Sequence, residues 1–348
     1  MTAEPSTNAS AFHGLARRRG WAMLCGLALA AALSLLAACL AGSVAIDPAD
    51  MLALIGRASP DEAHSLAASL LALRLERALS AFATGAMLAL AGTLMQALLR
   101  NPLADPYVLG LSGGAAVGAL LAMLLGAAAW LIDVSAFAGA MLVAGLIFLF
   151  AWRDLRAGLS EANGPLLLLT GVILAAGCGA LVTLMLSLAP EGRLRGMVFW
   201  LVGDLSATPL RLFPWAVLGA ALVFGLRAAR DINLMALHAE GAVALGVPVG
   251  RLRQRIFACA ALLTAAAVSN AGSIGFVGLL VPHACRFALG PDHRLLLPAA
   301  TLSGGAFLVL ADTLARTAVA PQQLPVGVVT ALIGVPVFLL QLHQARRR

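Results

Sequence analysis

Residues 164–186 read GPLLLLTGVILAAGCGALVTLML. This stretch carries no charged side chain, and it is as long as the roughly 20 apolar residues that cross the hydrocarbon core of a bilayer. In lipid, such a segment has to be a helix, because a helix satisfies the backbone hydrogen-bonding groups within one segment. The stretch therefore predicts a membrane-spanning helix, and runs of the same kind recur along the chain.

Ten such runs divide the chain. We expect spans at roughly 21–45, 77–98, 108–127, 132–152, 164–188, 208–228, 254–273, 274–289, 296–316 and 324–343. Charged residues make up 11% of the composition and hydrophobic residues 61%, whereas a soluble domain averages about 25% charged residues. The prediction is an all-α polytopic membrane protein with one transmembrane domain over 1–348, of which about 21–343 is embedded.

The first run resembles a cleavable leader at one point, because Leu36–Cys39 reads LAAC after three arginines. A signal peptide has an apolar region of only about 7–15 residues, and this run continues from Trp21 to about Ala45. We expect an uncleaved first helix. The alternative is a lipoprotein anchor, which an intact N-terminus in mass spectrometry would exclude.

The arginines predict the orientation of the spans. If the N-terminus is cytoplasmic, sixteen arginines fall on the inner side and seven on the outer side. Positive residues accumulate in cytoplasmic loops, so this bias favours ten spans with both termini in the cytoplasm. An odd number of spans would place Arg346–Arg348 outside, against the rule.

Several functions are disfavoured by missing residues. The chain has no lysine, and a phosphate-binding loop needs a lysine to reach the terminal phosphates of ATP, so any ATP that drives this protein has to bind another subunit. We found no zinc-protease spacing of histidines and no serine nucleophile elbow. The five scattered cysteines are interpreted as buried apolar residues. We therefore expect no enzyme, no catalytic residue, no cofactor, no metal site and no nucleic-acid partner.

The segment 229–253 is predicted to lie on the cytoplasmic side. Its middle, 233–246, has a helix-forming composition and ends at Gly246 before Pro248, which is a helix stop signal. Leu234, Leu237 and Leu245 mark an apolar side of this short helix. From these residues alone, the helix either rests on lipid headgroups or docks a partner.

Asp312 is one of the few ionisable residues within the expected spans, and such residues are functional candidates. Arg316 lies four residues on, so the two share a helix face. A proton-coupled secondary transporter would use Asp312 as its proton carrier, whereas a structural pair near the outer end of the helix is the other interpretation. Small residues at Gly110, Gly114 and Gly118 predict close helix packing, within the chain or across a dimer seam.

Two long blocks carry a family resemblance. The first, 74–120, contains RNPLADPYVLGLSGGA, and the second, from Gly272, contains GFVGLLVPHACR, DHRLLLP and LPVGVVTALIGVPVF. They resemble the permeases of the ABC importers for iron-siderophores, haem and cobalamin, the FecCD/BtuC-like permeases, over about 70–330. The resemblance implies a type II importer permease in the bacterial inner membrane, a ten-helix subunit with inverted halves that forms a homodimer around a central pathway. Two copies of an ATP-binding subunit and a periplasmic substrate-binding protein are the implied partners.

The resemblance also implies roles for individual residues. Arg74, Arg77 and Arg316 match outward-facing arginines that dock the binding protein, although Glu76 replaces a proline frequent in the family. The segment 233–250 matches the coupling helices, with Leu237, Glu240, Leu245, Gly246 and Val247 as ATPase contacts. The fifth and tenth spans would line the pathway, and the cytoplasmic gate would lie at Asn163, Gly164 and Pro165. Haem is slightly favoured as cargo over a ferric siderophore or cobalamin.

Overall fold

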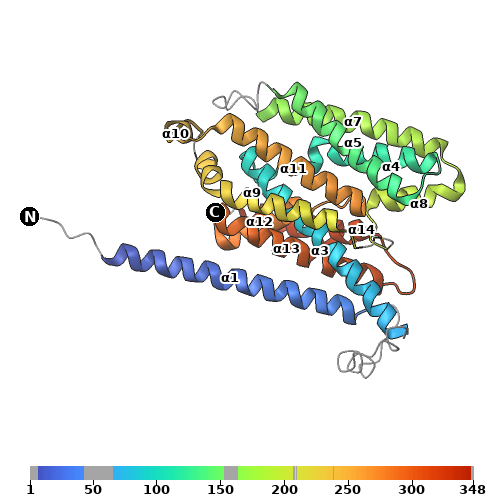
Figure 1. The fold of residues 1–348 in the computed structure, drawn as a ribbon, viewed down its shortest axis with the longest axis horizontal. Helices are drawn as coiled ribbons and strands as arrows, with labels where there is room; N and C mark the ends of the chain where they lie inside the picture. The colour runs from blue at the N-terminus through green and yellow to red at the C-terminus, as the bar shows by residue number, and fades with distance from the viewer. Residues whose placement is uncertain are drawn as a thin grey trace, which may run out of the picture.

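A computed structural model of the chain describes residues 7–42, 66–152, 164–206, 208, 210–237 and 239–345. Within these residues the secondary structure is entirely helical (Figure 1). The elements are α1 (Thr7–Leu40), α3 (Leu66–Leu98), η2 (Pro106–Leu109), α4 (Leu111–Leu124), α5 (Ala129–Phe150), α7 (Gly164–Leu188), α8 (Glu191–Val202), α9 (Leu212–Leu237), α10 (Ala239–Ala244), α11 (Val249–Ala271), α12 (Val277–Leu289), α13 (His293–Thr317) and α14 (Val326–Ala345).

The helices confirm the predicted all-α polytopic architecture. Among the described residues, 7 helices are long and apolar enough to cross a membrane, namely α1, α3, α5, α7, α9, α11 and α13. The shorter apolar helices 111–124, 277–289 and 326–340 coincide with the remaining three predicted spans. Each predicted span therefore corresponds to one helix.

Three details differ from the sequence-based expectation. The second helix is longer than the predicted span 77–98, because α3 begins at Leu66, so that Arg74 and Arg77 lie inside a helix. The first span ends at Leu40 rather than near residue 45. An additional helix, α8, follows α7 on the predicted outer side, where its mixture of arginine and apolar residues gave no periodic signal.

Helix α3 lies at the centre of the fold. In its most apolar stretch 94% of the residues are buried, and it packs against α13, α11, α12, α9 and α1. Glycines allow the closest approaches: a Cβ on Gly85 would lie 2.2 Å from the carbonyl oxygen of Gly304 on α13, and one on Gly92 would lie 1.9 Å from that of Gly278 on α12. Small residues at such contacts are typical of helix packing in membranes.

The glycines at 110, 114 and 118 pack within the chain. A Cβ on Gly114 would lie 2.5 Å from the carbonyl oxygen of Gly139, and one on Gly118 would lie 2.1 Å from that of Ser135, both on α5. Gly110 has a φ of 78° at the junction of η2 and α4, a left-handed conformation that favours glycine. These contacts support the intramolecular interpretation of this glycine pattern.

The two halves of the fold share one arrangement. A long buried helix, α3 or α11, is followed by an irregular segment and then by a short helix, α4 or α12. The two irregular segments meet inside the molecule, because the backbone N–H of Ile274 donates a hydrogen bond to the hydroxyl oxygen of Tyr107 (3.0 Å). Figure 1 shows that α10 and the beginning of α1 lie at one end of the helix array, while α8 and the beginning of α3 lie at the other.

Candidate functional site

The first candidate surface is a cluster of charged residues where α3 begins and α13 ends. Arg77 Nε lies 2.9 Å from Asp312 Oδ2, and Arg77 Nη2 lies 2.8 Å from Asp312 Oδ1. Arg77 Nη1 also donates to Gln323 Oε1 at 2.9 Å. The Asp312 side chain is only 4% exposed, so this two-point pair links α3 to α13 inside the protein.

The other two arginines of this cluster bind the last turn of α1. Arg74 Nη1 donates to the carbonyl oxygens of Cys39 (3.1 Å) and Leu40 (3.2 Å), and Arg316 Nη2 donates to the carbonyl oxygen of Ala38. The last four carbonyls of a helix have no partner within that helix, and cationic side chains there also interact favourably with the helix dipole. The cluster therefore fastens α1 to α3 and α13.

Burial changes how the predicted docking residues are understood. Arg74 is 7% exposed and Arg316 is 6% exposed, so both make their contacts within the chain. Arg77 is somewhat more accessible. The structure brings the three arginines together at one end of the molecule, where Asp312 and the end of α1 contact them.

Asp312 contacts two cations. Besides Arg77, Arg316 Nε lies 3.8 Å from Asp312 Oδ2, as the spacing of four residues predicted. The partner on α3 was not predicted, because it lies 235 residues away in sequence. These contacts link α3 to α13 through Asp312, which supports a structural role for Asp312 over that of a proton carrier.

The second candidate surface is formed by the end of α9 and by α10. Leu237 is 76% exposed and Leu245 is 69% exposed, and Glu240 is exposed between them. Exposed apolar residues grouped in this way mark an interaction site with a protein or with lipid. This surface lies at the end of the helix array opposite to the start of α3 (Figure 1).

The predicted helix over 233–246 is wrong in one respect. The structure has two helices, because α9 continues to Leu237 and α10 covers only Ala239–Ala244. The segment offers no glycine or proline at the break, so its composition could not reveal it. The predicted stop at Gly246 is confirmed: its φ is 82°, and the backbone N–H of Val247 donates to the carbonyl oxygen of Ala242, as in a glycine-terminated helix.

Val247 differs from the other residues predicted to contact an ATPase. It is buried in the main apolar core, whereas Leu237, Glu240, Leu245 and Gly246 are exposed. In this conformation Val247 anchors the segment to the rest of the chain and leaves the other four on the surface.

The predicted gate lies only partly within the described residues. Asn163 is outside them. Gly164 begins α7, and Pro165 follows in its first turn, where proline suits a helix because its missing N–H would have had no partner. The two described residues of the predicted gate therefore lie in the first turn of α7.

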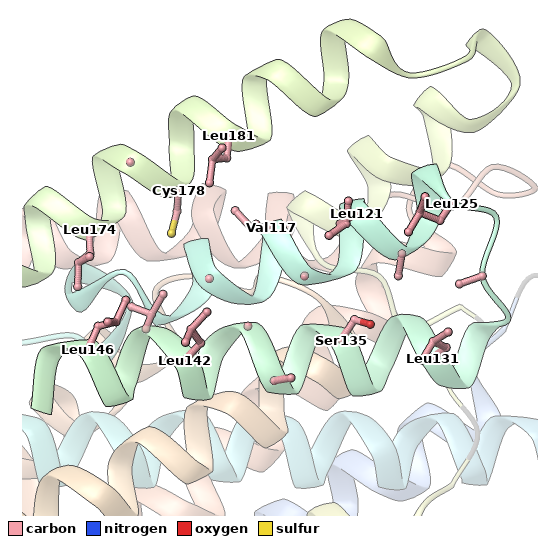
Figure 2. Close-up of a pocket in the computed structure, with 18 of the residues that line it drawn as sticks. Val117, Leu121, Leu125, Leu131, Ser135, Leu142, Leu146, Leu174, Cys178 and Leu181 are labelled. Atoms are coloured by element: carbon pink, nitrogen blue, oxygen red, sulfur yellow. The ribbon is translucent and has the colours of Figure 1, made fainter. Parts of the chain in front are cut away.

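Helix α7, the predicted pathway helix, is the least enclosed of the long apolar helices, since only 11% of its most apolar stretch is buried. It borders a groove of about 1190 Å³ formed with α4 and α5 (Figure 2). Figure 2 shows Leu174, Cys178 and Leu181 of α7 facing the groove from one side, with Val117 and Leu121 of α4 among the residues opposite. Apart from Ser135 and Cys178, the side chains that line the groove are apolar, so it suits an apolar occupant.

The RNPLADPY loop between α3 and α4 holds a buried carboxyl group. Asp105 Oδ1 accepts a hydrogen bond from the backbone N–H of Tyr107 (2.8 Å) and caps η2. Burial raises the pKa of Asp105 to about 6, although this hydrogen bond acts in the opposite direction. Burial also raises the pKa of the Tyr107 hydroxyl. The sequence block identified this loop, but it did not reveal that residues 104–106 are buried while Pro102 and Leu103 are exposed.

Metal-ligating side chains are dispersed. Among the described ranges, no group of three or more histidine, cysteine or acidic residues is close enough to hold a metal ion. The five cysteines are free thiols.

Comparisons with known proteins identify the family. The model of the FecCD transport family matches residues 26–344. The cobalamin import system permease protein BtuC of Halobacterium salinarum is 42% identical over 79% of this chain and 73% of its own length. The hemin transport system permease protein HmuU of Yersinia pestis is 41% identical over 79% of this chain and 84% of its own length.

Solved structures agree with this match. A structure described as an inward-facing conformation of a metal-chelate type ABC transporter superimposes with a TM-score of 0.80 at 30% identity, covering 92% of this chain and 99% of that one. The family model matches well over half of the chain, and the two relatives are similar through most of their own length. This multi-pass membrane protein is a member of the FecCD transport family.

Proposed function

We propose that this chain is the membrane permease of a binding-protein-dependent ABC importer, which moves a bulky metal chelate into the cytoplasm by ATP-driven alternating access. The family match over residues 26–344 carries this proposal. The absence of lysine agrees with it, because a chain without a phosphate-binding lysine depends on a partner to hydrolyse ATP.

The proposed assembly contains two copies of this permease, two ATP-binding subunits and one periplasmic binding protein, in the bacterial inner membrane with both permease termini in the cytoplasm. The exposed surface at Leu237, Glu240 and Leu245 supports the ATPase contact, because its two leucine side chains are largely exposed in the described chain. Gly246 ends the segment and Val247 anchors it to the permease core.

The arginine cluster supports docking of an acidic binding protein. Arg77 and Arg316 share one acid, Asp312, so these two cations keep an excess of positive charge. Charge complementarity of this kind raises association rates and fixes orientation more than it adds affinity. Because Arg74 and Arg316 are buried, we expect Arg77 to make the direct contact.

The proposed pathway is lined by α7 and α14, with its gate near Asn163, Gly164 and Pro165. The support is the apolar, uncharged character of α7 and its low burial. Haem is our preferred cargo over ferric siderophores or cobalamin. One relative is named for hemin transport and others for cobalamin, so the preference rests on the scarcity of polar groups along this surface.

Reconstitution tests the proposed function. Permease, ATPase subunit and loaded binding protein are placed in proteoliposomes, and uptake of haem, a ferric siderophore and cobalamin is compared. Uptake is expected only with all three proteins and ATP, and vanadate should abolish it. Uptake that persists without the ATPase and stops when the proton gradient collapses would instead establish a proton-coupled transporter.

Docking needs a separate test, because charge reversal at Arg77 alone would also break its pair with Asp312. The exchange Arg77→Asp with Asp312→Arg keeps an internal pair and the net charge. We expect this double variant to fold, and to bind the purified binding protein more slowly at low salt. An unchanged association rate would remove Arg77 from the docking surface.

A further inference from the structure

A second groove, with a volume of about 470 Å³, lies between the end of α9 and the start of α11. Val223, Phe224, Arg227 and Asp231 of α9 line it together with Leu252 and Arg255 of α11. One part of its wall is therefore apolar, and another part, at Arg227 and Arg255, is basic. The groove adjoins Pro248, which leads from the α10 segment into α11.

The exposed side chains of α9 and α11 change from apolar residues to arginines at this groove. On α9, exposed Val223 and Leu226 are followed by exposed Arg227 and Arg230 toward α10. On α11, which runs away from α10, exposed Arg251 and Arg255 come first, and Ala258 and Leu262 follow them on the exposed face.

Both surfaces thus turn from apolar to cationic toward the α10 end of the molecule. That change marks the boundary between hydrocarbon and headgroups in a membrane protein.

The two arginines that line the groove have no partner inside the described chain. Neither Arg227 nor Arg255 forms a hydrogen bond or an ion pair there, and Asp231 forms none either. With two cations against one acid, the groove keeps an excess positive charge. Basic pockets between transmembrane helices on the cytoplasmic side bind anionic lipid headgroups.

We propose that this groove binds an anionic phospholipid of the bilayer. The phosphate lies between Arg227 and Arg255, and an acyl chain extends along Val223, Phe224 and Leu252. The apolar wall selects a lipid over a soluble phosphate, and the positive charge selects an anionic over a zwitterionic headgroup. The bound lipid joins α9 to α11 directly beside the α10 segment.

Lipid binding to the purified full-length chain tests this proposal without the other subunits, so its outcome is independent of the transport assay. The chain is placed in nanodiscs of dioleoyl-phosphatidylcholine with increasing dioleoyl-phosphatidylglycerol, and retained lipid is measured by native mass spectrometry. The matched variants are Arg227→Gln/Arg255→Gln, which changes the groove, and Arg230→Gln/Arg251→Gln, which removes the same charge from the same helices outside it.

We expect the groove variant to bind phosphatidylglycerol about 30-fold more weakly, since each arginine in contact with the lipid phosphate contributes about a factor of five to binding of that lipid. The control variant should lose less than about threefold. Equal losses in the two variants would show a general surface-charge effect and overturn the proposal. If the double groove variant does not fold, the single variants Arg227→Gln and Arg255→Gln should each lose several-fold, and no loss in either would overturn it as well.

Competition separates a lipid from a free phosphate. Glycerol 3-phosphate should fail to displace the retained lipid, and Phe224→Ala should weaken binding of phosphatidylglycerol several-fold because it removes part of the apolar wall. Displacement by glycerol 3-phosphate at concentrations equal to those of the lipid, with Phe224→Ala unchanged, would show that the groove holds only a phosphate ion.

Discussion

The two ends of the molecule differ in which side chains they bury: charged side chains are buried at one end, and apolar side chains are exposed at the other. At the end where α3 begins, Arg74, Arg77 and Arg316 are turned inward and bonded to Asp312 and to the carbonyls of α1. At the end that carries α10, Leu237 and Leu245 are exposed to solvent. At the first end the charged side chains bond to groups of the same chain, whereas the second end offers an apolar surface that a partner can cover.

This difference has an energetic basis. A buried charge without a partner is costly, so a charged cluster inside the protein has to be satisfied in every state in which it stays buried. An exposed leucine costs little while the permease is alone, and it becomes favourable when a partner removes it from water. Variants at the two ends should therefore have different main effects: on the stability of the chain at the end where α3 begins, and on ATPase binding at the α10 end.

The largest effect is expected from Arg77→Gln. It leaves Asp312 buried with only the more distant Arg316 as a cation, and removing one partner of a buried ion pair costs about 3–5 kcal/mol. The melting temperature of the purified permease in detergent should fall by several degrees. The exchange Arg77→Asp/Asp312→Arg should recover part of the loss, and a single variant as stable as the parent would contradict the role of the pair.

The next effect concerns Leu237→Ala/Leu245→Ala. If an ATPase covers both side chains, truncating them should weaken its binding by at least about 100-fold, since burial of each leucine contributes about 1.5–3 kcal/mol. The permease alone should keep its stability within about 0.5 kcal/mol, as for other surface substitutions. Copurification with the ATPase measures the first quantity and thermal unfolding the second. If this variant lost stability but still bound the ATPase normally, the two leucines would stabilise the permease itself, which would contradict the difference proposed between the two ends.

A smaller effect is expected from Arg74→Gln, which removes the hydrogen bonds to the carbonyls of Cys39 and Leu40. A hydrogen bond from a charged donor contributes about 1.5–3 kcal/mol. The end of α1 should loosen, so that the buried thiol of Cys39 reacts faster with a maleimide. Arg230→Gln, an exposed residue of α9, is the control and should leave this rate unchanged. Equal rates in Arg74→Gln and the parent would mean that α1 is held by other contacts.

The smallest effect is a pH dependence at Asp105. Its folded pKa of about 6 exceeds the ordinary value of 3.8 because the group is buried, so the folded state binds this proton more tightly than the unfolded state does. This contribution to stability is fully present below about pH 4 and is lost as the pH rises through 6. Asp105→Asn should therefore melt a few degrees higher than the parent at pH 7 and at nearly the same temperature at pH 4. An equal difference at both pH values would contradict the buried carboxylate.

The sequence predicted what depends on local patterns. Uninterrupted apolar runs identified the spans, because length and hydropathy suffice in a bilayer. The pair of Asp312 and Arg316 followed from helical spacing, and the stop at Gly246 followed from glycine followed by proline.

What the sequence missed depends on distant contacts. The pair of Arg77 and Asp312 joins residues far apart in the chain, and nothing in the local sequence distinguishes an inward-facing arginine from an exposed one. The break after Leu237 falls in a run of helix formers. The groove beside α7 forms only when α4, α5 and α7 pack together, and the groove beside α9 forms only when α9 packs against α11.

The central claim is that the surface around Leu237 faces the cytoplasm and is covered by an ATPase. Labelling of Leu237→Cys with a membrane-impermeant maleimide tests it most directly. The control is Leu73→Cys, because Leu73 is exposed near the start of α3, at the opposite end of the molecule. In inside-out vesicles Leu237→Cys should label rapidly, and the ATPase subunit should protect it, while Leu73→Cys should label only from the opposite side and be unaffected by the ATPase. Labelling of Leu237→Cys from the outer side only, or at the same rate with and without the ATPase, would contradict the account.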